Sequence, residues 1–303
     1  MSRISNTTSK NLDRNPNTNI VQKVSDTAFW VASYRATESK RSDALFVDPL
    51  AEVLVGEFGK SIASSMHSIQ KYAYWSVIIR TRLIDDYISS YVSQGYKTII
   101  NLGAGLDTRP YRLSLPQDVH WIEIDFPEIM NFKNVKLRDH QPNFQLERIG
   151  LDLSHQAKRE EIFSALNERI IGPAIMLTEG VIPYLSEESV SGLAGAIHRQ
   201  SNFKLWICEY YAPEIYPRFQ DKRFKAMLGE APFQFFPSNW FEFFKNCGWN
   251  QKEVTYLYDV AKQNRRNFPL PWWASLMKLV FGEKMMSRIR KMSTYVVFER
   301  KQG

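Results

Sequence analysis

The chain has 303 residues, of which 44% are hydrophobic and 23% are charged, a composition that excludes a fibrous or wholly disordered protein and fits one large α/β domain or two small ones. Its net charge is +7, but Lys and Arg are spread along the chain without a long basic run, so nucleic-acid binding is not expected. The two cysteines, Cys208 and Cys247, are too few for a disulfide framework and lack metal-ligand spacing, so we expect free thiols, no bound metal and a cytoplasmic protein.

The amino-terminal segment is polar. Residues 1–23 are rich in Asn, Ser and Thr and lack the apolar region of a signal peptide, so they are predicted to be a disordered tail. No stretch approaches the ~18 apolar residues of a membrane span, so no transmembrane segment is expected. The most apolar stretch, residues 270–281, is predicted to be a packed lid or a wall of the substrate site, with a membrane-surface contact as the alternative.

Residues 24–93 have the pattern of helices. Asp26 fits the N-cap of a first helix, and Asp48 followed by Pro49 predicts the start of a second. Apolar residues recur at helical spacing from Ser76 to Val92, which predicts a third. These helices are expected to form a lid.

From residue 96 the pattern alternates between strand and helix. Apolar runs predict strands over residues 98–102, 119–124, 144–149, 173–178 and 204–209, and closing strands over 254–258 and 293–298. Helices are predicted between them, over residues 126–138, 155–169 and 187–200. Such alternation is typical of a parallel sheet with helices on both faces.

This pattern also predicts how the chain is organised. We expect a single domain over residues 24–303, with the helical lid at 24–93 and a ligand-binding core at 94–210. Residues 211–303 would contribute an aromatic-rich insertion and the closing strands. The insertion and the helical lid would roof a site at the carboxyl ends of the strands, where open α/β sheets bind ligands.

The first predicted strand runs into a Gly-x-Gly turn made by Gly103 and Gly105. Glycine permits a tight turn and lets a ligand approach the backbone closely. The third glycine of the dinucleotide fingerprint is replaced by Thr108, so pyrophosphate binding is not indicated. By itself the turn is also consistent with an ordinary strand end.

An acidic residue follows the second predicted strand. Asp125 lies 20 residues after Gly105, the offset typical of the acid that binds a ribose hydroxyl, and it disfavours a 2′-phosphate. Asp125 could instead cap the helix that follows, but its combination with the glycine turn favours ribose binding.

Two further acids follow later strands. Asp152 can accept a hydrogen bond from an adenine amino group while Leu153 covers the purine, although Asp152 alone is better explained as a helix cap. Glu179, at the end of the fourth strand, can accept hydrogen bonds from an α-amino group, or it can be a solvent-exposed strand end.

An arginine precedes the first strand. Arg80 can pair with an α-carboxylate through its planar guanidinium. Arg82 has Asp86 at i+4 and is expected to form a helical ion pair, whereas Arg80 has Ile84 there and is expected to be freer for a ligand. Together these features describe an adenosine joined to an amino acid without a pyrophosphate, which is S-adenosylmethionine.

The same residues resemble the leucine carboxyl methyltransferase family, and in particular its bacterial branch of S-adenosylmethionine-dependent methyltransferases. The matching stretches occur in family order over about residues 24–210, and they are residues 24–36, 48–51, 80–86, 102–113, 123–128, 152–153 and 179–185. The resemblance implies a class I methyltransferase, Rossmann-like fold with a mostly parallel seven-stranded sheet. It also implies the following cofactor contacts: Arg80 to the methionine carboxylate, Gly103 and Gly105 to the methionine side, Asp125 to the ribose, Asp152 and Leu153 to the adenine, and Glu179 to the amino-acid end.

We therefore expect an O-methyltransferase that acts on a carboxylate or hydroxyl of a small molecule, such as a secondary metabolite. An NAD-dependent oxidoreductase and a non-catalytic S-adenosylmethionine-binding protein remain alternatives. A carboxylate acceptor needs no base, whereas a hydroxyl acceptor needs one. The sequence does not choose among five candidate bases, so no catalytic residue is assigned; they are His140, His155, His198, Tyr34 and Tyr184.

Overall fold

The computed structural model describes residues 24–56, 70–228, 232–269, 282 and 287–301. The tail predicted over residues 1–23 and the apolar stretch 270–281 lie outside the described residues. Within the described ranges, no helix combines the length and the apolar character that crossing a membrane requires.

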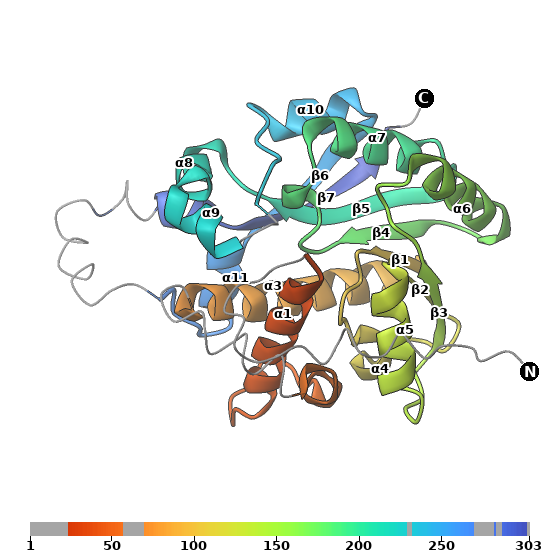
Figure 1. The fold of residues 1–303 in the computed structure, drawn as a ribbon, viewed down its shortest axis with the longest axis horizontal. Coiled ribbons are helices and arrows are strands. Elements are labelled where there is room, and N and C mark those ends of the chain that lie inside the picture. Colours follow the sequence, from red (N-terminus) through yellow and green to blue (C-terminus); the bar gives the residue numbers. More distant parts are fainter. Residues whose placement is uncertain (1–23, 57–69, 229–231, 270–281, 283–286, 302–303) are drawn as a thin grey trace, which may run out of the picture.

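A seven-stranded sheet organises the chain, in the order β3-β2-β1-β4-β5-β7-β6 (Figure 1). The pairs among β1 to β5 are parallel, and β7 is antiparallel to both β5 and β6. The strands are β1 (Thr98–Leu102), β2 (His120–Asp125), β3 (Gln145–Gly150), β4 (Ala174–Thr178), β5 (Phe203–Tyr210), β6 (Trp249–Tyr256) and β7 (Thr294–Arg300). The predicted mostly parallel sheet of seven strands is confirmed.

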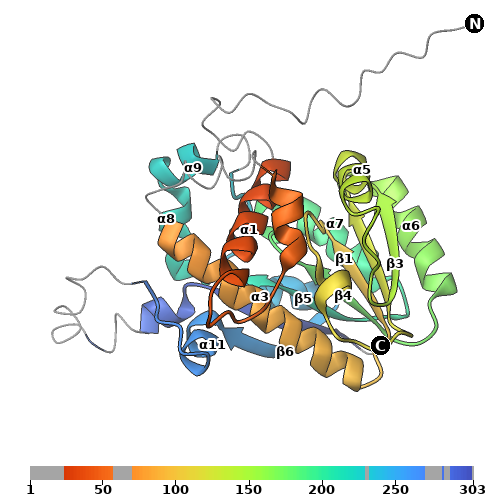
Figure 2. The ribbon, with the colours of Figure 1, turned by 90° about the horizontal axis from the view of Figure 1, so that it is seen from below.

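Helices cover both faces of the sheet (Figures 1 and 2). One face carries α3 (Gln70–Ser93), α4 (Arg109–Arg112), α5 (Pro127–Lys136) and α11 (Leu257–Gln263). The other carries α6 (Gln156–Arg169), α7 (Glu187–His198) and α10 (Trp240–Asn246). The helices predicted between the strands are confirmed to within two residues at either end.

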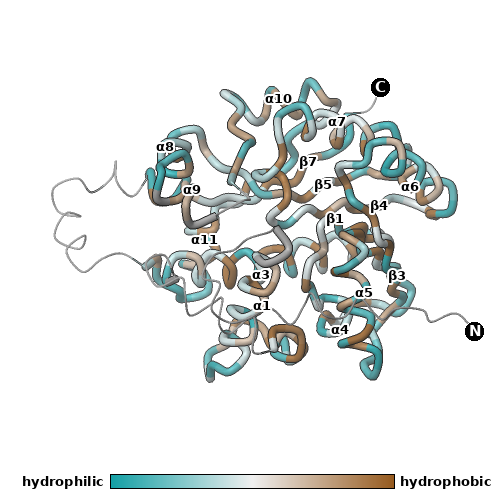
Figure 3. Tube along the Cα trace, in the orientation of Figure 1, coloured by the Kyte–Doolittle hydropathy of each residue, from teal (hydrophilic) through white to brown (hydrophobic). Residues whose placement is uncertain are grey.

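The strands separate two hydrophobic cores. Successive side chains of a strand point to opposite faces, so Ile99 packs with residues of α3 and α11, whereas Ile100 packs with residues of α6, α7 and α10. Figure 3 shows hydrophobic residues concentrated along the central strands. The near-continuous apolar runs of β1 and β4, buried at every position, therefore reflect burial on both sides.

The remaining helices lie at the amino-terminal and insertion segments. The predicted helices of the amino-terminal part are found at α1 (Val24–Ser39), at residues 49–56 and at α3, which begins at Gln70 rather than Ser76. Helix α1 packs against α3, as Figure 2 shows. The insertion adds short elements: η1 (Ile182–Tyr184), η2 (Pro213–Ile215), α8 (Tyr216–Gln220) and α9 (Lys222–Leu228).

The first closing strand is present, but its predicted bounds were wrong at both ends. Residues 254–258 were expected to be a strand, but β6 spans Trp249–Tyr256 and Leu257 begins α11. Leu257 is fully buried, so its apolar character is equally compatible with a strand and with a short helix. An apolar run of this length does not distinguish the two.

The topology places one crevice at the centre of the sheet. From β1 the chain moves outward to β2 and β3, then returns to β4 on the other side of β1. The strand order therefore reverses between β1 and β4. Open α/β sheets bind ligands at this switch point, beyond the carboxyl ends of the strands.

Candidate cofactor-binding site

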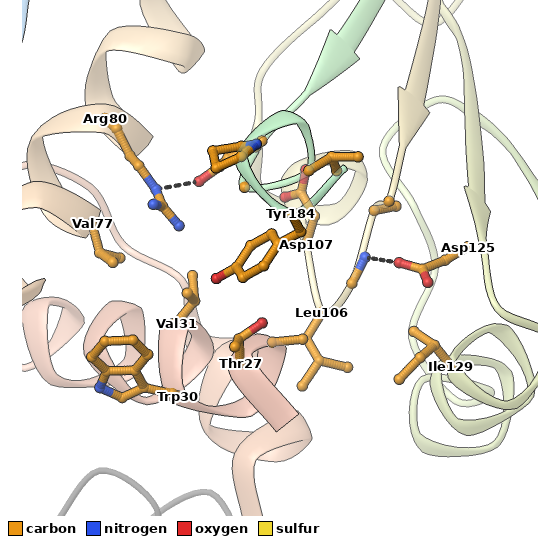
Figure 4. Close-up of a pocket in the computed structure, with 18 of the residues that line it drawn as sticks. Thr27, Trp30, Val31, Val77, Arg80, Leu106, Asp107, Asp125, Ile129 and Tyr184 are labelled. Carbon is orange, nitrogen blue, oxygen red and sulfur yellow. Dashed lines mark hydrogen bonds and ion pairs between the residues drawn. The ribbon is translucent and has the colours of Figure 1, made fainter. Parts of the chain in front are cut away.

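A cavity of about 430 Å³ lies at the carboxyl ends of β1, β2 and β4, at the switch point. It is lined by all seven residues that the sequence predicts as cofactor ligands: Arg80, Gly103, Gly105, Asp125, Asp152, Leu153 and Glu179. Figure 4 shows Thr27, Trp30 and Val31 of α1 and Arg80 of α3 on one side of the cavity, with Asp125 opposite. The structure thus gathers side chains that are far apart in the sequence.

The glycine turn after β1 has a conformation that other residues rarely adopt. Gly103 has a φ of +65° and Gly105 a φ of +48°, in the left-handed region that favours glycine. A Cβ atom on Gly103 would lie 2.4 Å from Cγ2 of Val181, in the loop after β4. Glycine at position 103 therefore lets the loops after β1 and β4 meet at the edge of the cavity.

Asp125 holds this turn from the end of β2. Its Oδ2 accepts a hydrogen bond from the backbone N–H of Gly105 at 2.6 Å, and its Oδ1 accepts one from the backbone N–H of Phe126 at 2.7 Å. Phe126 is the N-cap residue of α5, and no side chain caps that helix, so the alternative of Asp125 as a simple helix cap is wrong. Burial raises the pKa of Asp125, and the two backbone hydrogen bonds oppose that rise.

The segment after β3 forms another edge of the cavity. Oδ1 of the exposed Asp152 accepts a hydrogen bond from the backbone N–H of Ser154 at 2.9 Å, which closes a turn ahead of α6. Leu153 packs against the hydrophobic core, and its carbonyl accepts a hydrogen bond from Arg159 Nη1 at 2.7 Å. The turn therefore presents an apolar side chain and a carboxylate together.

Arg80 and Glu179 pair with each other. Nε of Arg80 donates to Oε1 of Glu179 at 2.9 Å, and both side chains are mostly buried. Arg80 has no acidic partner at i+4 on its own helix, as its spacing predicts, but it pairs with an acid from the end of β4. Its role toward a ligand stays a prediction. The expected ion pair of Arg82 with Asp86 is confirmed at 2.9 Å.

A second arginine, which the sequence analysis did not assign to the site, binds the same glutamate. Arg109 is 2% exposed, and its Nη1 donates to Glu179 Oε2 at 2.9 Å and to Asp107 Oδ2 at 2.8 Å. Its Nε donates to Asp85 Oδ1 at 2.7 Å. The spacing of these residues in the sequence does not predict that Arg109 binds Glu179. The one indication is that Arg109 lies in a stretch that resembles the family.

These groups form a balanced ionic cluster, which we define as Arg80, Arg109, Arg112, Asp85, Asp107 and Glu179. Arg112 joins it through two hydrogen bonds to Asp85, at 2.6 and 2.8 Å. Three guanidiniums thus face three carboxylates. Burial raises the pKa of Glu179, but Arg109 and Arg80 outweigh this effect and hold the pKa below its usual value. Glu179 therefore stays ionised at neutral pH.

Aromatic side chains line another part of the cavity. We call this part the aromatic wall, and it comprises Trp30, Tyr72, Tyr184, Tyr211, Phe219, Phe224 and Phe233. The ring of Phe233 lies 5.0 Å from that of Tyr184 and 5.1 Å from that of Phe219, centroid to centroid.

The aromatic-rich insertion was expected to help roof the site. Phe233 of the insertion lines the cavity, but Phe235 and Trp240 of the insertion are buried in the core, and the apolar stretch 270–281 lies outside the described residues.

Of the five candidate bases, Tyr184 lines the cavity. Burial raises the pKa of Tyr184 to about 12, so its hydroxyl is protonated at neutral pH. The described part of the cavity lining contains no histidine. The lining therefore offers hydroxyl groups, but no side chain with the ordinary pKa of a general base stands at the aromatic wall.

The donor set fits S-adenosylmethionine chemically. A carboxylate at the end of β2 suits ribose hydroxyls, and Leu153 beside Asp152 suits a purine with an exocyclic amino group. The cation of Arg80 and the anion of Glu179 suit the carboxylate and the ammonium of an amino acid. The lining meets each part of the cofactor with a group of complementary chemistry.

Comparison with known proteins shows the family of this chain. Residues 28–198 match the model of the leucine carboxyl methyltransferase family. A relative from Mycobacteroides abscessus, named as a candidate S-adenosyl-L-methionine-dependent methyltransferase, is 34% identical over 192 residues, which cover 57% of this chain and 61% of that protein. The match thus spans less than two thirds of that relative.

Longer matches extend the comparison. A relative from Frankia alni with the same kind of name is 28% identical over 81% of this chain and 90% of that protein. A solved structure of a candidate methyltransferase from Thermobifida fusca superposes with a TM-score of 0.55 at 12% identity, covering 95% of this chain and 97% of that one. This structural likeness concerns the fold.

Proposed function

Because the chain belongs to the leucine carboxyl methyltransferase family, we propose that it transfers the methyl group of S-adenosylmethionine to an oxygen atom of a small molecule. The observation that carries the proposal is the oppositely charged pair of Arg80 and Glu179, which lines the same cavity as Asp125 at the switch point of the sheet. That combination suits an amino acid joined to a nucleoside.

Each part of the cofactor has a partner in this proposal. Asp125 binds the ribose, and Asp152 with Leu153 binds the adenine. The carboxylate and ammonium of the methionine end meet Arg80 and Glu179. The chemistry of the cavity lining and the family support these assignments.

The glycine turn has its own part in the proposal. Gly103 and Gly105 let the methionine side lie close to the backbone of the turn, because glycine has no side chain to obstruct it.

The chain contributes mainly by positioning. When bound, S-adenosylmethionine supplies an electrophilic methyl group on a positively charged sulfur. The aromatic wall excludes water and orients the acceptor, because aromatic side chains provide a large, rigid apolar surface. Such a wall suits a small anionic or amphipathic molecule with an apolar body.

The described lining supports an acceptor that is ionised at neutral pH without a general base. A carboxylate is already charged at neutral pH and requires no general base, whereas an ordinary hydroxyl does. Since Tyr184 keeps its proton at neutral pH, the lining favours a carboxylate or an acidic hydroxyl. The NAD-dependent alternative receives no support from the family or from Thr108 at the position of the third glycine.

Methyl transfer can be tested on a library of small carboxylic acids and phenols. The protein is incubated with S-adenosylmethionine carrying a labelled methyl group, and the products are identified by mass spectrometry. A methyl ester or ether supports the proposal, and a product methylated on nitrogen or carbon overturns the O-methyltransferase assignment. Binding of S-adenosylhomocysteine without transfer to any acceptor supports the non-catalytic alternative.

The acceptor class can be separated by pH once one acceptor is known. Single-turnover rates on a carboxylate should stay flat from about pH 6 to 8, because the carboxylate is ionised throughout. Rates on a hydroxyl should rise over this range as the proton is removed.

A further inference from the structure

The two arginines that bind Glu179 are held very differently. Arg109 is anchored by Asp85 and Asp107 as well as by Glu179, and its backbone N–H also donates to Asp107 Oδ1 at 2.9 Å. Among the described residues, Glu179 is the one hydrogen-bond partner of the Arg80 side chain. Figure 4 shows the other two guanidinium nitrogens of Arg80 directed into the cavity.

This asymmetry matters when a ligand carboxylate arrives. Arg80 can turn toward that carboxylate because a single interaction, with Oε1 of Glu179, holds it. Arg109 cannot follow, since Asp85 and Asp107 fix its guanidinium at 2.7 and 2.8 Å. Glu179 would then keep one cationic partner, through its Oε2.

We propose that Arg109 is a positioning residue of the cofactor site: it holds the Glu179 carboxylate in place as an acceptor for the ligand ammonium when Arg80 engages the ligand carboxylate. This inference rests on the proposed function. Arg109 does not touch the ligand in this account. It acts through Glu179, which would otherwise be a buried carboxylate without a fixed cation.

The physical consequence concerns protonation. A buried carboxylate that loses its cations becomes easier to protonate, and a protonated carboxyl is a poor acceptor for an ammonium group. In the wild-type protein Arg109 prevents this, with Arg35 also lowering the pKa of Glu179, so Glu179 itself should add no pH dependence to ligand affinity between about pH 5.5 and 7.5. Burial raises the pKa of Glu209, which interacts with Arg80 and Glu179, to about 7, and its titration contributes to wild type and variants alike. Without Arg109, affinity should fall as the pH is lowered.

The test is calorimetric titration with S-adenosylhomocysteine across that pH range, on wild type, R109Q, R109K and the control R82Q. Arg82 forms an ion pair with Asp86 away from the cavity, so R82Q should behave as wild type. For R109Q we expect affinity to fall about tenfold more than for wild type between pH 7.5 and 5.5. R109K keeps a cation, so its affinity should fall less than that of R109Q as the pH is lowered.

A ligand analogue distinguishes positioning from general damage. S-adenosylhomocysteine lacking its α-amino group has no partner for Glu179, so R109Q and wild type should show the same pH dependence with it. Equal weakening of both ligands at every pH, or a wild-type pH profile in R109Q, would overturn the proposal. If R109Q does not fold, R109K decides by the same criteria. Failure of the wild-type protein to bind S-adenosylhomocysteine would instead refute the proposed function.

Discussion

Nε of Arg80 donates to Oε1 of Glu179 across 2.9 Å, so the two side chains assigned to the charged ends of one amino acid are each other's partner in the protein alone. Together they form a mostly buried cation and anion facing one cavity. A zwitterion can insert between two such groups and replace one ion pair by two, which leaves the charge of the site unchanged. The ionic cluster is therefore suited to an amino acid before any ligand is present.

Replacing Arg80 by lysine should weaken binding of S-adenosylhomocysteine by about 1–3 kcal/mol, because an ammonium group cannot reproduce the planar fork of a guanidinium. A cofactor analogue without its carboxylate should bind wild type and R80K alike. Calorimetry with both ligands measures the difference. If R80K still discriminates fully between them, another cation holds the carboxylate.

Asp125→Ala should weaken the same binding by about 1–3 kcal/mol, the cost of leaving ribose hydroxyls unpaired. The Asp125 side chain also accepts hydrogen bonds from the backbone of Gly105 and Phe126. Asp125→Asn should therefore lose less cofactor affinity than Asp125→Ala. The matched control is Asp118→Ala, which removes an exposed aspartate paired with Lys97. Unchanged affinity in a folded Asp125→Ala protein would remove this residue from the site.

Gly103→Ala should destabilise the fold more than Gly172→Ala does. Both positions have positive φ, +65° and +83°, but a Cβ on Gly103 meets Val181 at 2.4 Å whereas one on Gly172 meets nothing within 4 Å. The backbone strain costs about 1–2 kcal/mol at either site, and the contact with Val181 adds about 1–3 kcal/mol at Gly103. Urea denaturation measures the free energy of unfolding of both variants. Equal losses of stability would show that the loops after β1 and β4 separate easily to admit the new methyl group.

Glu209, at the end of β5, should make stability depend on pH. Its Oε1 accepts hydrogen bonds from the backbone N–H groups of Val181 and Ile182 at 2.8 and 3.1 Å, and its buried Oε2 has no partner among the described residues. Burial raises the pKa of Glu209 to about 7 from 4.5, with Arg80 and the backbone hydrogen bond from Val181 opposing the rise and Glu179 adding to it.

An acid whose pKa is raised on folding contributes stability at low pH that is lost as the pH rises. For Glu209 the loss falls between about pH 4.5 and 7 and amounts to about 2–3 kcal/mol. Glu209→Gln should therefore gain stability relative to wild type over that window, measured as the free energy of unfolding in urea at each pH. The stability of the exposed control Glu168→Gln should vary with pH as that of wild type does. If the stability of Glu209→Gln also varied with pH as wild type does, the prediction would be contradicted.

The sequence predicts the parts of this molecule that depend on local pattern. Strands β1 and β4 are short apolar runs buried on both faces, and Asp125 and Glu179 are acids placed where such strands end. The ionic cluster was not predictable in this way, because two of the three carboxylate partners of Arg109 lie 24 residues before it and 70 residues after it. A buried charge needs partners that only the folded chain brings near.

Titration calorimetry with S-adenosylhomocysteine and with NAD, on the full chain at neutral pH, tests the nature of the cofactor site. We predict saturable binding of S-adenosylhomocysteine, weakened by Asp125→Ala, and no binding of NAD at the same concentrations. Saturable binding of NAD together with no response to S-adenosylhomocysteine would contradict the assignment of this cavity to S-adenosylmethionine.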